Sequence, residues 1–172
     1  SLWKTIDNRN GFFPVQDGAY IFDIPFFNQE VIREAINNAV AHRDYKLSSE
    51  VLIKQYPNYL EVINPGGFPK GVSIDNIITV NSTPRNRRLA EVLSKTGTVE
   101  RSGQGVDKIY FQCLSEAKGE PDYSKSDDYQ VELHLSGIVQ DKAFALFIGK
   151  IQEEKSYDER LSVHEILILE KI

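Results

Sequence analysis

The sequence predicts an α/β (α+β) two-layer sandwich, in which helices cover one face of a mixed or antiparallel sheet. First, two segments at 50–56 and 59–64, rich in Val, Ile, Leu and Tyr, indicate a hairpin. Second, residues 29–42 and 106–118 show the periodicity of amphipathic helices. Third, 172 residues, of which 41% are hydrophobic, are enough for one domain with a substantial core.

The sequence predicts little regular structure in the first 27 residues and one clear helix after them. Glycine and proline interrupt the first 27 residues, which indicates irregular or extended chain with a short strand near 19–23. Asn28 is a favourable N-cap, and a helix is expected from Gln29 to His42. Its apolar face consists of Val31, Ile32, Ala35, Ile36, Ala39 and Val40.

Later elements follow the same reasoning. In chain order they are the hairpin, a short helix over 73–79 capped by Ser73, a helix over 86–95 stopped by Gly97, a helix over 106–118 ended by Gly119, a loop over 121–128, a strand over 129–135, and helices over 141–155 and 161–172.

Three segments are expected along the chain. Residues 1–22 would connect to a missing upstream domain, residues 23–155 would form the main domain, and residues 156–172 would begin a C-terminal helical region. The chain contains no methionine, so we expect it to be a piece of a longer protein.

Composition narrows the classes of function. The net charge of −5 argues against strong nucleic-acid binding by this segment itself. No apolar run approaches the ~18 residues of a membrane span, and no signal-peptide pattern opens the chain. The single cysteine, Cys113, precludes an internal disulfide and is expected in the core, so the cytoplasm is the expected location.

The most informative motif lies inside the first helix. Glu34 and Asn38 are four residues apart, so they share one helical face. With His42 they lie along the edge of the apolar stripe and should face a cleft. The pair could supply a base and a ligand for metal or phosphate; the alternative is a surface glutamate and an amide that caps backbone groups. His42 and Arg43 would complement the helix dipole, with a phosphate or neighbouring-chain contact as the alternative.

Two glycine turns follow this helix. Gly66 and Gly67 come directly after a strand and would allow backbone to approach a ligand closely. Gly103 and Gly105 precede a helix, whose first N–H groups can bind an anion. Each turn taken alone is equally typical of an ordinary loop. No G-x-x-x-x-G-K-[ST] motif is present, so a P-loop enzyme is not expected.

The remaining charged candidates have weaker patterns. Arg85, Arg87 and Arg88 gather at a helix start, and Arg101 precedes the second glycine turn. They are either solvated surface charge or groups that face a phosphate or a partner. The isolated His134 and His164 are expected to be structural, without a zinc site.

The order of these motifs resembles the N, G1 and G2 boxes of the GHKL (Bergerat-fold) ATPases. The motifs are Glu34-x-x-x-Asn38-Ala39, Asn64-Pro65-Gly66-Gly67 and Gly103-x-Gly105. The His-Arg-Asp-Tyr and Asn-Pro-Gly-Gly sequences resemble more closely a divergent branch of transcriptional regulators, often labelled RecG-related ATP-dependent DNA helicases. The resemblance covers about Asp23 to Val139. In that branch the domain usually follows an AlbA/Schlafen-like DNA-binding domain and precedes a winged helix, so the resemblance implies that residues 156–172 could begin a winged helix.

The resemblance implies a Mg-ATP site. Glu34 would activate water and Asn38 would bind Mg²⁺. The nucleotide-binding residues would be Asn38, Asn64, Gly66, Gly67, Arg101, Gly103 and Gly105, with the glycines of the second turn at the phosphates and residues 85–88 in a lid. The family normally has an aspartate where Asn64 stands, and an amide oxygen accepts a hydrogen bond without that charge.

Two functions are therefore expected as alternatives. The first is an ATP-binding regulatory domain of a DNA-binding transcriptional regulator, with weak Mg-dependent ATP hydrolysis. Its partners would be an adenine nucleotide and, through absent flanking domains, DNA, with no membrane. The second is a degenerate fold that serves as a scaffold or dimerisation domain, so a homodimer is considered. Helicase activity finds no support, because the segment has no Walker lysine.

Overall fold

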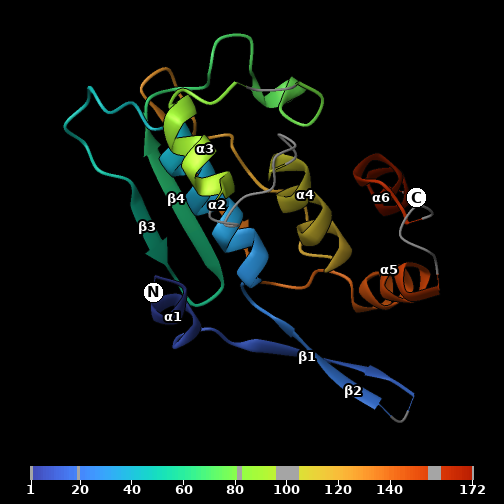
Figure 1. The fold of residues 1–172 in the computed structure, drawn as a ribbon. Coiled ribbons are helices and arrows are strands. Elements are labelled where there is room, and N and C mark those ends of the chain that lie inside the picture. The colour runs from blue at the N-terminus through green and yellow to red at the C-terminus, as the bar shows by residue number, and fades with distance from the viewer. Residues whose placement is uncertain (1, 19, 81–82, 96–104, 155–159, 172) are drawn as a thin grey trace.

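The computed structural model describes residues 2–18, 20–80, 83–95, 105–154 and 160–171. Its elements are α1 Leu2–Asp7, β1 Phe12–Asp17, β2 Tyr20–Pro25, α2 Gln29–His42, β3 Leu52–Gln55, β4 Tyr59–Pro65, the 3₁₀ turn η1 Ile74–Asn76, α3 Arg87–Lys95, α4 Gly105–Ser115, β5 Gln130–Ser136, α5 Lys142–Glu154 and α6 Val163–Glu170 (Figure 1). Strands β3, β4 and β5 form one antiparallel sheet, and β1 and β2 form a separate hairpin. The predicted α+β class is confirmed.

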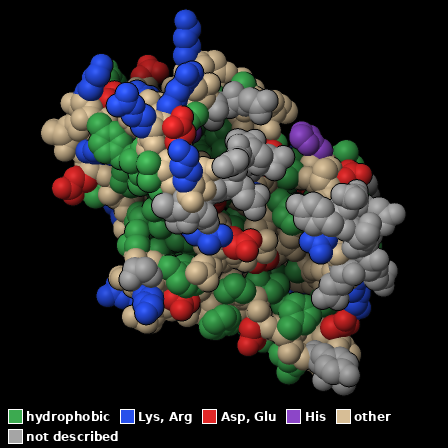
Figure 2. Space-filling view, in the orientation of Figure 1, with side chains coloured by type: hydrophobic (Ala, Val, Ile, Leu, Met, Phe, Trp, Pro, Cys, Tyr) green, Lys and Arg blue, Asp and Glu red, His purple; other side chains and the backbone are tan. Residues whose placement is uncertain are grey.

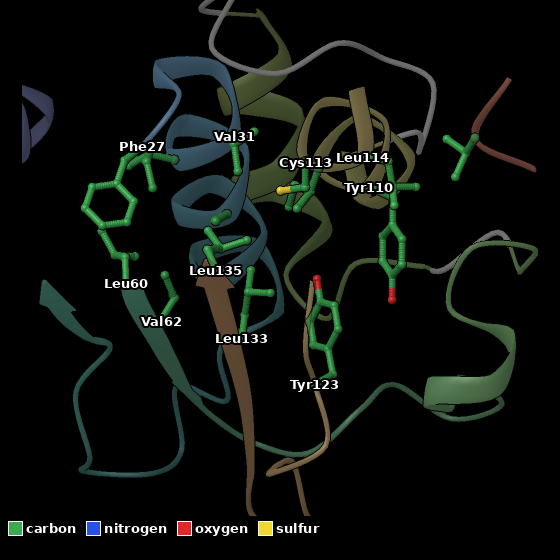
Figure 3. Close-up of a cluster of buried hydrophobic side chains, with 14 of the residues drawn as sticks. Phe27, Val31, Leu60, Val62, Tyr110, Cys113, Leu114, Tyr123, Leu133 and Leu135 are labelled. Atoms are coloured by element: carbon green, nitrogen blue, oxygen red, sulfur yellow. The ribbon is translucent and has the colours of Figure 1, made fainter. Parts of the chain in front are cut away.

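Helix α2 begins and ends where the sequence predicts. The Asn28 side chain accepts a hydrogen bond from the backbone N–H of Glu30 at 2.9 Å, as an N-cap does. The apolar stripe of α2 packs with α4 against one face of the sheet, and the core between them is shown in Figure 3. Its completely buried members include Leu60 of β4, Ile109 and Leu114 of α4, and Ile166 of α6.

The strand β4 lies between β3 and β5, so the sheet places it at the centre. Successive side chains of a strand point to opposite faces. Leu60 and Val62 therefore point into the core, whereas Glu61 points outward and forms ion pairs with Lys54 and Lys125. Asn64 lies on the same face of β4 as Leu60 and Val62, and only 5% of its surface is exposed.

Three sequence predictions need correction. The first 27 residues contain a helix, α1, besides the extended hairpin β1–β2. The segment 73–79 forms only the 3₁₀ turn η1. Helix α4 ends at Ser115 and not at Lys118, because Ala117 adopts φ 51° and the N–H of Lys118 bonds to Cys113 O at 2.9 Å, which closes the helix before Gly119. Gly97 lies outside the described residues.

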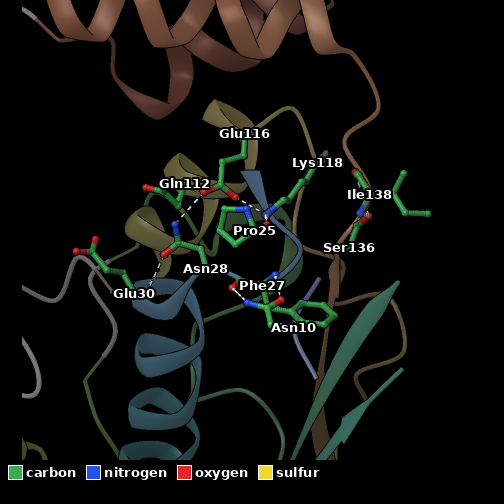
Figure 4. A network of polar contacts seen from close by, with 10 residues as sticks. All are labelled: Asn10, Pro25, Phe27, Asn28, Glu30, Gln112, Glu116, Lys118, Ser136 and Ile138. Carbon is green, nitrogen blue, oxygen red and sulfur yellow. Dashed lines mark hydrogen bonds and ion pairs between the residues drawn. The ribbon is translucent and has the colours of Figure 1, made fainter. Parts of the chain in front are cut away.

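A polar network joins the start of α2 to the end of α4 (Figure 4). Glu116 accepts hydrogen bonds from Asn28 Nδ2 and Gln112 Nε2, each at 2.8 Å. It also pairs with the buried Lys118, whose ammonium group donates to Pro25 O at 2.6 Å. A buried ammonium needs such partners, and the network thereby fixes α4 against α2 and β2.

Candidate functional site

A cavity of about 880 Å³ lies beside the polar edge of α2. Its walls come from α2, β4, β5, the segment around η1, α3 and the start of α4. These elements are far apart in the sequence, and packing in the hydrophobic core brings them together around the cavity. Figure 2 shows Lys and Arg side chains gathered over the end of the molecule where α3 begins. Arg87 and Arg88, at the start of α3, are exposed.

Glu34, Asn38 and His42 all line this cavity. Glu34 is only 8% exposed, so it is not an ordinary surface glutamate. The start of α4 lies directly against it: a Cβ atom added to Gly105 would be 2.1 Å from Glu34 Oε1 and 3.1 Å from Asn38 Nδ2. The structure therefore brings Glu34, Asn38 and Gly105 together, although they are up to 71 residues apart in the chain. Any side chain at position 105 would displace this arrangement.

Four residues that line the cavity each carry a buried polar atom that has no hydrogen-bond partner among the described residues. These atoms are Asn38 Nδ2, His42 Nδ1, Asn64 Oδ1 and Ser94 Oγ. Leaving a buried polar group unpaired costs about 1–3 kcal/mol, and native structures contain few such groups. Their concentration on one cavity indicates a polar ligand or ordered water there.

The two glycines of the first turn have different surroundings. Gly67 lines the cavity, whereas Gly66 adopts φ 99° and packs beside Asp44, with room for no Cβ: that atom would be 2.8 Å from Asp44 Cβ. The N–H of Gly66 donates to Tyr129 O at 2.7 Å. The structure thus gives Gly66 a role in the turn itself.

The arginines also differ from one another. Arg85 forms an ion pair with Asp44 at 3.2 Å and donates to Gly67 O at 2.9 Å, so it holds the turn. Arg87 lines the cavity, and Arg88 is exposed. Arg101 and Gly103 lie outside the described residues.

Three titratable groups that line the cavity have shifted pKa values: His42, Asp107 and Tyr123, and burial raises the pKa of the Tyr123 hydroxyl. Burial lowers the pKa of His42, and the positive charge of Arg85 lowers it further, so the imidazole is neutral at pH 7. Burial raises the pKa of the Asp107 carboxyl, and His164 partly opposes this. Cys113 is a core residue as predicted, and burial raises the pKa of its thiol to about 12.

Ser94 and Asp107 are cavity residues that sequence analysis missed. Asp107 follows Gly105 by two residues, so its position after the glycine turn was an available signal. Ser94 shares a face of α3 with Arg87, Ala90 and Glu91, but nothing in the sequence indicates that this face meets a cavity. Within the described ranges no cluster of three or more His, Cys, Asp or Glu side chains could hold a metal ion.

Comparisons with known proteins show the family to which the chain is similar. A family model described as "Putative ATP-dependent DNA helicase recG C-terminal" matches residues 48–135. Among solved structures, the DIP2311 protein from Corynebacterium diphtheriae has the same fold, with a TM-score of 0.84 and 24% sequence identity over 99% of this chain. The present chain spans only 34% of that protein. No curated protein matches the chain. Among the described helices, none is long and apolar enough to cross a membrane.

Proposed function

The chain belongs to the family described as putative ATP-dependent DNA helicase RecG C-terminal, an ATPase-like family, and on this premise we propose that the cavity binds an adenine nucleotide in the manner of GHKL ATPases. The observation that carries the proposal is the set of unpaired buried atoms on the cavity wall, led by Asn38 Nδ2 and Asn64 Oδ1. An adenine nucleotide offers the amino group and the anionic oxygens that such atoms need.

Asn64 would bind the base. Its Oδ1 is a buried acceptor at the end of β4, and adenine's exocyclic amino group is a donor. Gly67, which also lines the cavity, would let the backbone approach the ring. The amide forms this hydrogen bond without the charge of an aspartate, so we expect weaker binding than a carboxylate would give.

The other end of the site would hold the phosphates. Mg²⁺, when bound with ATP, neutralises phosphate charge and helps to align the reacting oxygens. The Asn38 amide oxygen would be its protein ligand, and the backbone at Gly105 begins a helix whose N-terminus favours anions. Glu34, next to both, would orient and deprotonate the attacking water. Arg101 and Gly103 remain proposed phosphate ligands.

At the level of the whole protein we propose a regulator that acts on DNA through flanking domains. Residues 1–22 would connect to the upstream domain, residues 23–155 would bind nucleotide and residues 156–172 would begin a helical region. Nucleotide would shift the chain between two arrangements by binding one of them more tightly. The proposed location is the cytoplasm.

Thermal unfolding of the 172-residue chain tests the nucleotide proposal, with Mg-ATP, Mg-ADP and Mg-GTP as ligands. A ligand at about 100 times its Kd stabilises by about 2.7 kcal/mol, and each kcal/mol raises the midpoint by roughly 2–4 °C at this size. We expect a rise of several degrees that is specific to adenine nucleotides and is lost in Asn38→Ala. An equal rise with GTP, or an undiminished rise in Asn38→Ala, would contradict the proposal.

The alternative function is a scaffold or dimerisation domain that has lost its ligand. The uncharged Asn64 at the base-binding position favours it. The scaffold alternative predicts no shift of the unfolding midpoint at millimolar nucleotide. It also predicts that nucleotide does not change the sedimentation coefficient of the chain.

A further inference from the structure

A second unpaired atom lies at the same end of the cavity as Asn64. His42 is the last residue of α2, and its buried Nδ1 has no hydrogen-bond partner in the part of the chain that the structure describes. The dipole interpretation of this residue does not account for an unpaired ring nitrogen on a cavity wall. A ligand atom would account for it.

Backbone hydrogen bonding brings together the two chain segments that carry His42 and Asn64. The N–H of Asp44, two residues after His42, donates to Pro65 O at 2.8 Å, and Pro65 directly follows Asn64. Both side chains line the cavity. Glu34 is eight residues before His42, which corresponds to about 12 Å along the helix axis. The His42–Asn64 end is therefore well separated from the Glu34–Gly105 end, as a base is from its terminal phosphate.

The charge state of His42 suits a hydrogen bond to a base. Burial and the charge of Arg85 both lower its pKa, so the ring is neutral, with one N–H and one lone pair. A neutral imidazole can donate from Nδ1 without placing a cation in the pocket.

We propose that His42 determines base specificity: its Nδ1–H donates to a ring nitrogen beside the adenine amino group, while Asn64 Oδ1 accepts from that amino group. This inference rests on the proposed nucleotide function. In adenine the amino donor is flanked by ring nitrogens that accept. Guanine has the acceptor O6 in place of the amino group, so it would leave Asn64 Oδ1 facing another acceptor. A site that leaves buried polar groups unpaired rejects the wrong ligand strongly.

The test measures Kd by calorimetry for Mg-ATP, Mg-GTP and the analogues 1-deaza-ATP and 7-deaza-ATP, each of which lacks one of the flanking nitrogens. Wild-type protein should bind one of the two analogues about tenfold more weakly than ATP, the effect of one hydrogen bond near the upper end of the usual range. In His42→Leu, ATP and that analogue should bind equally, both weakly. His42→Asn should restore part of the difference, since its amide N–H reaches near the Nδ1 position.

His134→Leu is the matched control. This variant makes the same His-to-Leu change on the outer face of β5, where the ring stacks on Tyr59 at 4.7 Å between centroids. It should leave the Kd of each analogue relative to that of Mg-ATP unchanged. If wild-type protein binds ATP but loses affinity for neither deaza analogue, the inference on His42 is overturned while the nucleotide site stands. If it binds no nucleotide at all, the proposed function itself fails. The analogue series on wild-type protein needs no variant to fold.

Discussion

At the residue scale, Glu34 gives the sharpest test of chemistry. It is buried beside Asn38 and the start of α4, at the end of the cavity away from Asn64. Glu34→Gln keeps the shape but removes the base, so we expect ATP turnover to fall by about 10²–10⁴-fold with little change in nucleotide affinity. Phosphate release and calorimetry measure the two effects separately.

Glu30→Gln is the control for this substitution. It makes the same chemical change one helical turn earlier, at an exposed position of α2, and should leave turnover as it is. Undiminished hydrolysis in Glu34→Gln would remove Glu34 from the proposed chemistry. Turnover that falls equally in both variants would point to a general effect of charge on the helix.

At the scale of elements, the segment before α3 is fixed to the end of α2. Asn86 Nδ2 donates to Ala41 O at 3.1 Å and to Arg43 O at 2.7 Å, carbonyls near the C-terminal end of the helix. Asn86→Ala removes both bonds, so we expect a loss of about 1–2 kcal/mol in the free energy of unfolding. Arg88→Ala, at an exposed position of α3, should change it by less than about 0.5 kcal/mol. Urea unfolding compares the two, and equal effects would show that the bonds to α2 contribute nothing.

Elements with strong local signals could be predicted, and those that depend on distant contacts could not. Helix α2 has its own N-cap and a continuous apolar stripe, so its bounds follow from the sequence. Helix α1 has one buried residue, Ile6, whose carbonyl accepts from the distant Gln55 at 3.0 Å. Helix α4 ends where Ala117 adopts φ 51°, and the next residue, Lys118, is held by the distant Pro25, a tertiary contact that no local pattern indicates.

The same distinction applies to the candidate site. The order of Glu34, Asn38 and Gly105 led to their grouping, because a helical face and a glycine turn are local features. Ser94 was missed because only tertiary packing of α3 brings it to the cavity. Helical spacing predicts that His42 faces the cleft, but only the three-dimensional structure reveals its unpaired nitrogen.

At the scale of the whole molecule, the last helix tests where the domain ends. Ile166 of α6 is fully buried in the main core, together with residues of α2, α4 and the sheet, whereas Ile168 on the same helix is 62% exposed. If α6 is integral to the domain, Ile166→Ala should lower the free energy of unfolding by about 2–5 kcal/mol in one cooperative transition. Ile168→Ala, the same change two residues away, should cost less than about 0.5 kcal/mol.

Thermal and urea unfolding followed by circular dichroism measure both variants. Matching small losses, or a separate transition for α6, would show that residues 156–172 form a unit of their own, as the three-segment division proposes. A large loss confined to Ile166→Ala would make α6 part of the structure that holds α4, and hence Gly105, against Glu34.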